Sequence, residues 1–112
     1  MSNKAQFTAL QEIIALFRAM DRAFPLQYIS CLLIIAEHPG LSVSELARKS
    51  GIKLPTVSRI IGTLSHSRQK GAGFELIEIA NSPEQRRSKT LRLSKKGEDL
   101  CAKISSFSQK SH

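Results

Sequence analysis

The sequence has little of what most enzymes and metalloproteins need. Its two cysteines, Cys31 and Cys101, match no metal-ligand spacing. We expect both to be buried free thiols, with a disulfide or redox switch as the alternative. None of the three histidines has an acid or thiol partner at a spacing that indicates a triad, and no glycine-rich phosphate loop follows a strand. We therefore predict that the chain is not an enzyme and that it binds no metal or cofactor.

Long apolar runs are also missing. The longest one, residues 31–36, is far too short to cross a bilayer. The N-terminus has no continuous apolar stretch behind a charged start, which a secretory signal would require. We therefore expect a cytoplasmic protein with no membrane partner.

Acidic residues are scarce, and the shortage is local. The chain has 17 lysines and arginines against 9 acidic residues, and its formal net charge is +8. Residues 1–43 and 97–112 are each neutral, so the whole excess lies in residues 44–96, where twelve basic residues accompany four glutamates. A basic excess confined to one segment indicates a polyanionic partner bound by that segment.

Within this segment, two short amphipathic helices are predicted on either side of Gly51. The first has its apolar residues at Val43, Leu46 and Ala47, and the second has them at Val57, Ile60, Ile61 and Leu64. A small residue four positions before a glycine fits the crossing of a helix-turn-helix. We expect Ser44 to cap the first helix and Pro55 to occupy the first position of the second.

The second helix leaves short hydrogen-bonding side chains and one arginine outside its apolar stripe. Such side chains suit a helix that enters a major groove and touches base edges and phosphates, although a solvated face of an ordinary helical domain is the alternative. The residues expected to face the groove are Pro55, Thr56, Ser58, Arg59, Thr63 and His66. Those expected to contact phosphates are Lys53, Arg68, Lys70 and Lys95.

After a basic loop at residues 65–73, the apolar period changes from that of a helix to that of a strand. Residues 74–80 and 89–94 alternate as two strands around a polar tip at residues 81–88. Two strands with a basic tip directly after a helix-turn-helix are typical of a wing. The predicted DNA contacts of this wing are Arg86, Arg87 and Lys89.

The remaining elements complete a single domain over residues 1–112. Helices are predicted over residues 4–20 and 26–38, a short edge strand over residues 41–43, and a last helix over residues 95–109 capped by Ser94. The chain is thus predicted to be mainly α with a small β-wing. The fold is a winged helix-turn-helix with extra N- and C-terminal helices.

The first helix is apolar around more than half its circumference, so it needs a second surface to pack on. It is either central in the fold or part of a dimer interface, and we favour a homodimer. Residues 1–24 and 95–112 are expected to contribute to it. The predicted interface residues are Leu10, Ile13, Ile14, Phe17, Leu100, Ile104 and Phe107.

Two stretches, LSVSELARKSGIKLPTVSRIIGTL and SPEQRRSKTLRLSKKGEDL, resemble the MarR family (multiple antibiotic resistance regulators). The second stretch carries the more specific features, which are an Arg-rich tip, an alternating strand and Leu-Ser-x-x-Gly. The resemblance implies a homodimer on an inverted-repeat operator. It places the helix around residues 55–66 in the major groove and Arg87 in the minor groove, where a guanidinium meets a strongly negative potential.

The sequence departs from that family pattern in three places. Gln85 stands where family wings usually carry an Asp, so the ion pair that would hold Arg87 is missing. The connection from Leu64 to Leu76 is longer than usual. The chain also ends soon after the last helix begins, which leaves more of the dimer contact to residues 5–20 and removes much of the usual ligand pocket. A small-molecule effector is therefore not indicated.

Three functions are compatible with this pattern. The leading one is a sequence-specific regulator that binds double-stranded DNA, acting as a repressor by occupying a promoter. The second is a DNA-binding accessory factor in replication, partition or phage development. The third is a winged helix used for protein contact, which predicts apolar residues on the exposed face of the second helix.

Overall fold

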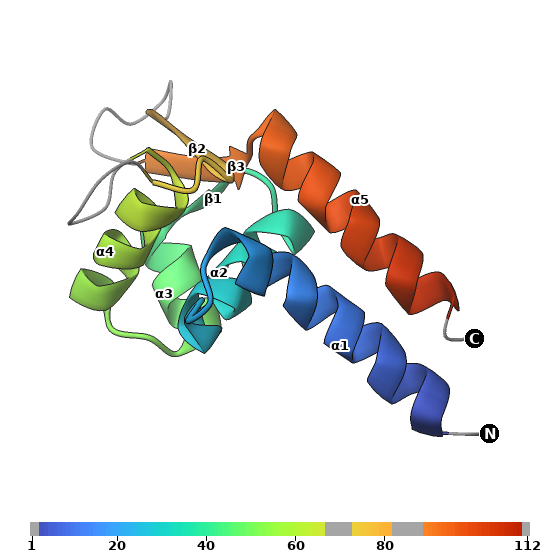
Figure 1. The fold of residues 1–112 in the computed structure, drawn as a ribbon. Coiled ribbons are helices and arrows are strands. Elements are labelled where there is room, and N and C mark those ends of the chain that lie inside the picture. The colour runs from blue at the N-terminus through green and yellow to red at the C-terminus, as the bar shows by residue number, and fades with distance from the viewer. Residues whose placement is uncertain (1–2, 67–72, 82–88, 111–112) are drawn as a thin grey trace. The chain divides into compact units, whose positions relative to one another are not determined.

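The computed structural model describes residues 3–66, 73–81 and 89–110 and divides the chain into two compact units (Figure 1). One unit combines residues 1–24 with 99–112, and the other is residues 25–98. The elements are α1 (Asn3–Met20), α2 (Leu26–Glu37), β1 (Leu41–Ser42), α3 (Val43–Ser50), α4 (Leu54–Leu64), β2 (Ile77–Asn81), β3 (Lys89–Leu93) and α5 (Lys95–Lys110). This order confirms the predicted mainly helical fold with a small β-wing.

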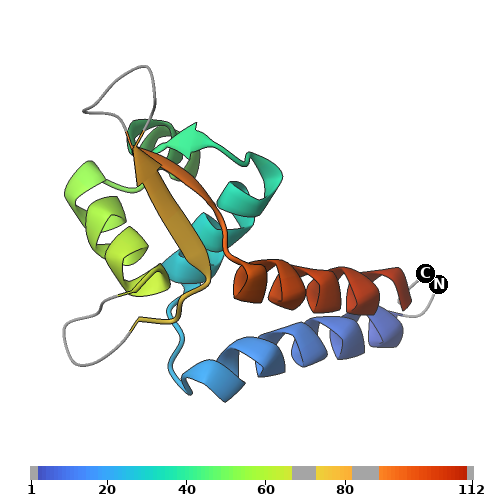
Figure 2. The ribbon, with the colours of Figure 1, turned by 90° about the horizontal axis from the view of Figure 1, so that it is seen from above.

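In the unit of residues 1–24 and 99–112, α1 and α5 run antiparallel, so the start of α1 and the end of α5 lie together (Figures 1 and 2). Phe17 is only 1% exposed, and its ring centroid lies 5.1 Å from that of Phe24. This tilted arrangement is a favourable one for two aromatic rings. Three large apolar side chains of α1 stay exposed: Phe7, Leu10 and Ile14.

In the unit of residues 25–98, α2, α3 and α4 contact one another and α2 also contacts β3. The core is formed by the apolar positions that the periodicity predicted on α4, together with residues of the other elements. The fully buried members include Leu32, Ile35, Leu46, Val57, Ile60, Leu64, Leu76 and Leu91. The apolar stripe of α4 therefore faces inward, which leaves its opposite face to solvent.

The three strands form an antiparallel sheet with β3 in the centre and the two-residue β1 at one edge. Leu41 pairs with Leu91 across β1 and β3, and Asn81 pairs with Lys89 across β2 and β3. Residues 82–88 therefore connect two strand ends that are already paired. The predicted edge strand and wing strands are present, but β1 ends at residue 42, and β2 begins at residue 77 rather than at residue 74.

The N-cap of α3 differs from the prediction, because the helix begins two residues earlier. Ser42, not Ser44, is the cap. The Ser42 hydroxyl accepts from the Glu45 N–H at 3.1 Å, and the Glu45 carboxylate accepts from the Ser42 N–H at 3.0 Å. The bond from the Ser42 N–H, and after it the interaction with the Ser42 side chain, lower the pKa of the Glu45 carboxyl. Only a cap at residue 42 places a glutamate at the third helical position, where this reciprocal pair can form.

The turn after α3 is closed by Gly51, which has φ of 72° and donates its N–H to the Ala47 carbonyl oxygen at 3.0 Å. A side chain at this left-handed conformation would be strained, so glycine is the natural residue here. The chain then enters α4 with Lys53 as the N-cap and Pro55 at the second helical position rather than the first. Pro55 still removes no helical hydrogen bond there.

Residues 74–76 end α4 and join it to the sheet. The N–H groups of Phe74, Glu75 and Leu76 bond the carbonyl oxygens of Thr63, Ser65 and Leu64, respectively. In a continuing helix these carbonyls would accept from N–H groups four residues further on. Since they are already occupied, the helix stops at Leu64.

The start of α5 packs closely against the same segment. The Ser94 hydroxyl donates to the Glu75 carbonyl oxygen at 2.6 Å and accepts from the Gly97 N–H at 3.0 Å, so Ser94 caps α5 as predicted. The Ser94 N–H bonds the Leu76 carbonyl oxygen at 3.0 Å. A Cβ atom on Gly97 would lie only 2.0 Å from that same oxygen. Only glycine fits at this position without a shift of the backbone.

Candidate nucleic-acid interface

The outward face of α4 carries most of the residues predicted to face a groove. In Figure 1 this helix lies at the outside of its unit, with β2 and β3 above it. Pro55, Ser58 and Arg59 are exposed, while Thr56 and Thr63 are half-buried at the edges of the face. The face is therefore polar and basic over a buried apolar stripe. A winged helix that contacts proteins through α4 would present more apolar residues here than the exposed Leu54 and Pro55 at the start of the helix.

Thr63 presents an acceptor rather than a donor. Its hydroxyl donates to the Arg59 carbonyl oxygen at 3.3 Å, one turn earlier in α4. Because the single hydroxyl proton is used in that bond, the oxygen lone pairs remain for an incoming donor. Ser58 and Arg59 supply the donors on the same face.

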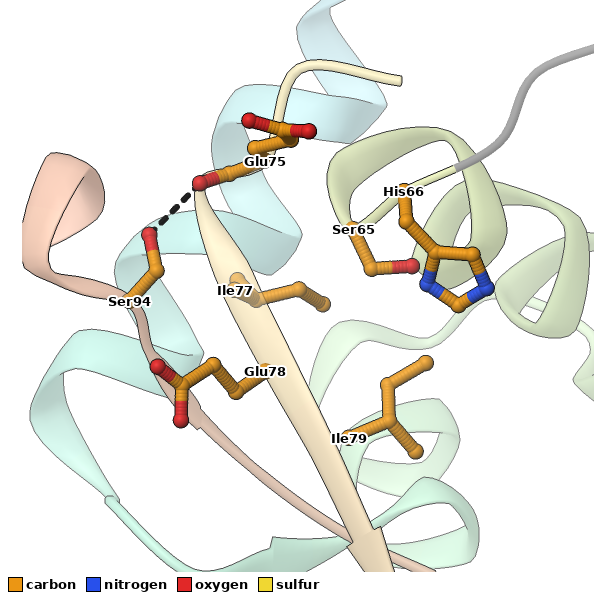
Figure 3. Close-up of a pocket in the computed structure, with 7 residues that line it drawn as sticks. All are labelled: Ser65, His66, Glu75, Ile77, Glu78, Ile79 and Ser94. Carbon is orange, nitrogen blue, oxygen red and sulfur yellow. Dashed lines mark hydrogen bonds between the residues drawn. The ribbon is translucent and has the colours of Figure 1, made fainter. Parts of the chain in front are cut away.

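His66 lies outside the helix to which it was assigned. α4 ends at Leu64, and His66 follows in the turn, exposed, with Ser65 before it. It lines an open pocket of about 440 Å³ between the end of α4 and β2 (Figure 3). In Figure 3, Ile77 and Ile79 point from β2 toward this pocket. The prediction that His66 belongs to the recognition helix is wrong. The N–H groups of residues 74–76 bond the carbonyl oxygens at the end of α4, and the helix ends at Leu64.

The described basic residues outside α4 that were predicted to contact DNA fall in three places. Lys53 is exposed at the start of α4, and Lys89 and Lys95 are exposed at the first residues of β3 and α5. The other predicted basic contacts lie outside the described residues: Arg68, Lys70, Arg86 and Arg87. Gln85, which replaces the usual Asp, is also outside them.

Two basic residues next to α4 were given no role from the sequence. Arg48 and Lys49 are exposed in the last turn of α3, just before the turn at Gly51. Both belong to the basic excess found in the sequence. Their position at the end of the helix before α4 is the feature that could have indicated a contact with DNA. Two cations there also interact favourably with the negative end of the helix dipole.

Arg92 contributes to the basic total but not to a free positive patch. Its guanidinium bonds the Glu78 carboxylate across the β2–β3 pair, with nitrogen–oxygen distances of 3.0 and 3.1 Å. Both side chains are exposed, so the pair adds little stability, yet it neutralises one arginine of the hairpin.

The residues predicted to form the dimer interface separate into two groups. Leu10 and Ile14 are exposed, as is their neighbour Phe7, and Ile13, Ile104 and Phe107 are half-buried. Phe17 and Leu100 are instead buried within the single chain. The single chain therefore leaves these two residues little surface for a partner, because helical periodicity cannot separate a core stripe from an adjoining exposed one, and their place in an interface stays a prediction.

The two cysteines and the described acidic residues form no arrangement typical of a metal site. Cys31 is buried as predicted, but Cys101 is only half-buried. Burial raises the pKa of both thiols, which keeps them protonated and unreactive near neutral pH. Among the described residues, no three histidine, cysteine or acidic side chains are arranged to hold a metal ion. None of the described helices is long and apolar enough to cross a membrane.

Comparison with known proteins gives a consistent result. Residues 25–67 match the model of the MarR family. This match ends before the wing stretch that carried the more specific motifs in the sequence. No curated protein matches the chain.

Several solved structures share the fold. The transcriptional repressor CouR, bound to a 23-mer DNA duplex, has 25% identity and a TM-score of 0.67, covering 98% of this chain and 71% of CouR. The S. aureus MepR–DNA complex has 19% identity and a TM-score of 0.71, with coverage of 94% and 77%. Bordetella bronchiseptica BpsR, whose DNA binding is regulated by 6-hydroxynicotinic acid, has 18% identity and a TM-score of 0.63, with coverage of 95% and 76%.

Proposed function

We propose that the chain is a winged helix-turn-helix transcription regulator of the MarR family, and that it is a repressor that binds an inverted-repeat operator as a homodimer. The observation that carries this proposal is the polar and basic outer face of α4 above its buried stripe. The outer face of α4 offers hydroxyl groups that can donate or accept hydrogen bonds and one guanidinium that can donate them. A helix that binds in a major groove contacts base edges through such side chains.

The charge distribution supports the same proposal. Exposed cations precede α4 in the chain at Arg48 and Lys49 and follow it at Lys89. Each cation that neutralises a phosphate releases counterions and steepens the salt dependence of binding by about one unit of slope. Base contacts from α4 would select the sequence, while these residues would fix the position of the protein on the duplex.

The homodimer is proposed through α1. Its exposed stripe of Phe7, Leu10 and Ile14 gives the molecule an apolar surface at helical spacing. A two-fold dimer matches a two-fold operator, because each copy presents one α4 to one half-site. A single domain over residues 1–112 and a cytoplasmic location belong to the same proposal, and no effector is included in it.

Selection of bound sequences from a random duplex pool, with excess competitor DNA, tests this function. The expected result is an enriched inverted repeat whose half-sites lie about one helical turn, ~10 base pairs, apart. Placed over a promoter in a transcription assay, that repeat should lower the transcript yield when the protein is added. Binding without enrichment would replace the repressor with an architectural or accessory factor. No binding would favour the protein-contact function.

Replacement of Arg87 by Ala is expected to weaken operator binding by about 1–3 kcal/mol without changing the unfolding midpoint. Arg87 lies outside the described residues, in the connection between the paired ends Asn81 and Lys89. Titrations at one fixed moderate salt concentration measure the effect. Arg92→Ala on the same hairpin is the matched control, because Glu78 already neutralises that arginine. Equal affinities of Arg87→Ala and the unaltered protein would exclude the wing contact.

A further inference from the structure

The first residue of α4 is apolar and exposed, although most of the outer face of this helix is polar. Leu54 is 47% exposed and is followed by the exposed Pro55. A single exposed leucine is ordinary on a protein surface. This one, however, starts the helix that the proposed function places in a major groove, and N-terminal residues of such a helix contact base edges.

The first two residues of α4 offer no side-chain hydrogen bond to a base edge. The side chain of Leu54 has no polar atom, and Pro55 lacks even a backbone N–H. The first polar side chains of the helix are those of Thr56 and Ser58. Any contact made by the first two residues is therefore an apolar one.

Only one base presents an apolar group in the major groove, which is thymine with its C5-methyl group. Cytosine, adenine and guanine place amino, ring nitrogen or carbonyl groups there, and a leucine against those groups would remove water without replacing its hydrogen bonds. We propose that Leu54 is a specificity-determining residue that reads a thymine methyl in each half-site. This inference rests on the proposed function.

Ser58 places that thymine within the half-site. It lies four residues after Leu54, on the same side of the helix and one turn further along. The base that Leu54 contacts is therefore adjacent to the part of the half-site that Ser58 reaches. Thr56 and Thr63 lie toward the other side of the outer face and contact different positions.

A thymine-to-deoxyuridine scan of the selected operator tests this inference, because the substitution removes the C5-methyl and keeps the base pair. Each duplex is titrated with the unaltered protein and with Leu54→Ala at one salt concentration. At one thymine per half-site, deoxyuridine is expected to weaken binding of the unaltered protein about fourfold, the effect of one methyl-sized group. Leu54→Ala should bind both duplexes equally, and Leu54→Met should restore the difference.

Leu26→Ala is the matched control. Leu26 is the first residue of α2, as Leu54 is of α4, and it is 83% exposed, so its replacement should leave the methyl effect intact. If the methyl effect persists in Leu54→Ala, or if a specifically bound operator shows none at any thymine, Leu54 does not read a methyl while the regulator function stands. If the protein enriches no sequence, the proposed function fails and this inference fails with it.

Discussion

Gly97→Ala is expected to destabilise the protein by about 3 kcal/mol, although alanine is the better helix former by about 1 kcal/mol. The new Cβ would overlap the Leu76 carbonyl oxygen, which is backbone and cannot turn away as a side chain could. Relief requires residue 76 or the start of α5 to move. Movement would stretch the bonds from Ser94 to Leu76 and to Glu75. Thermal unfolding should show a melting temperature lower by roughly 10–20 °C.

Lys96→Ala is the control for this variant. Lys96 is the exposed neighbour of Gly97 in the same turn of α5, so its replacement should change stability by no more than about 0.5 kcal/mol. The sign of the Gly97 effect is the decisive quantity. A stabilised Gly97→Ala would mean that helix propensity governs the site and that the close approach to Leu76 does not exist in solution.

Leu10→Asp is expected to convert the proposed dimer into a monomer. Leu10 is 54% exposed in the single chain, so the charge costs the protomer little. In a two-fold interface the substitution buries two unpaired carboxylates, each at a cost of several kcal/mol. The dimer dissociation constant should rise by a factor of about a hundred or more, and light scattering should report half the mass. Operator affinity should fall with it.

Thr8→Asp separates the dimer effect from a general effect of charge on α1. Thr8 is also exposed, and two residues before Leu10 it lies on the opposite side of the helix. It adds the same charge to the same element, so it should leave the mass and the operator affinity unchanged. An unchanged mass for Leu10→Asp would remove α1 from the interface.

Periodicity was enough to predict the fold and the inner face of α4. Val57, Ile60, Ile61 and Leu64 were expected to be buried from their spacing, and all four are. The glycine-closed turn and the Ser94 cap were also predicted, because each depends on only a few neighbouring residues. The polar face of α4 followed from the buried one.

The predictions that failed depended on groups distant in sequence or on a competing local pattern. His66 was placed in the helix because residues 74–76, which end it, lie ten positions away. Serine is an equally good N-cap residue at positions 42 and 44. The helix begins after Ser42 because this cap allows the reciprocal hydrogen bonds with Glu45. Phe17 shares the apolar part of α1 with Leu10, and only the folded structure separates the buried residue from the exposed one.

The bonds between residues 63–65 and residues 74–76 also have an evolutionary consequence. They hold both ends of the connection between α4 and the wing, so this attachment does not require a particular number of residues between them. Closing a flexible loop of twice the length costs only about 0.6 kcal/mol. Insertions and deletions at this point are therefore nearly neutral, and related chains can vary in length here while α4 and the wing keep the same attachment.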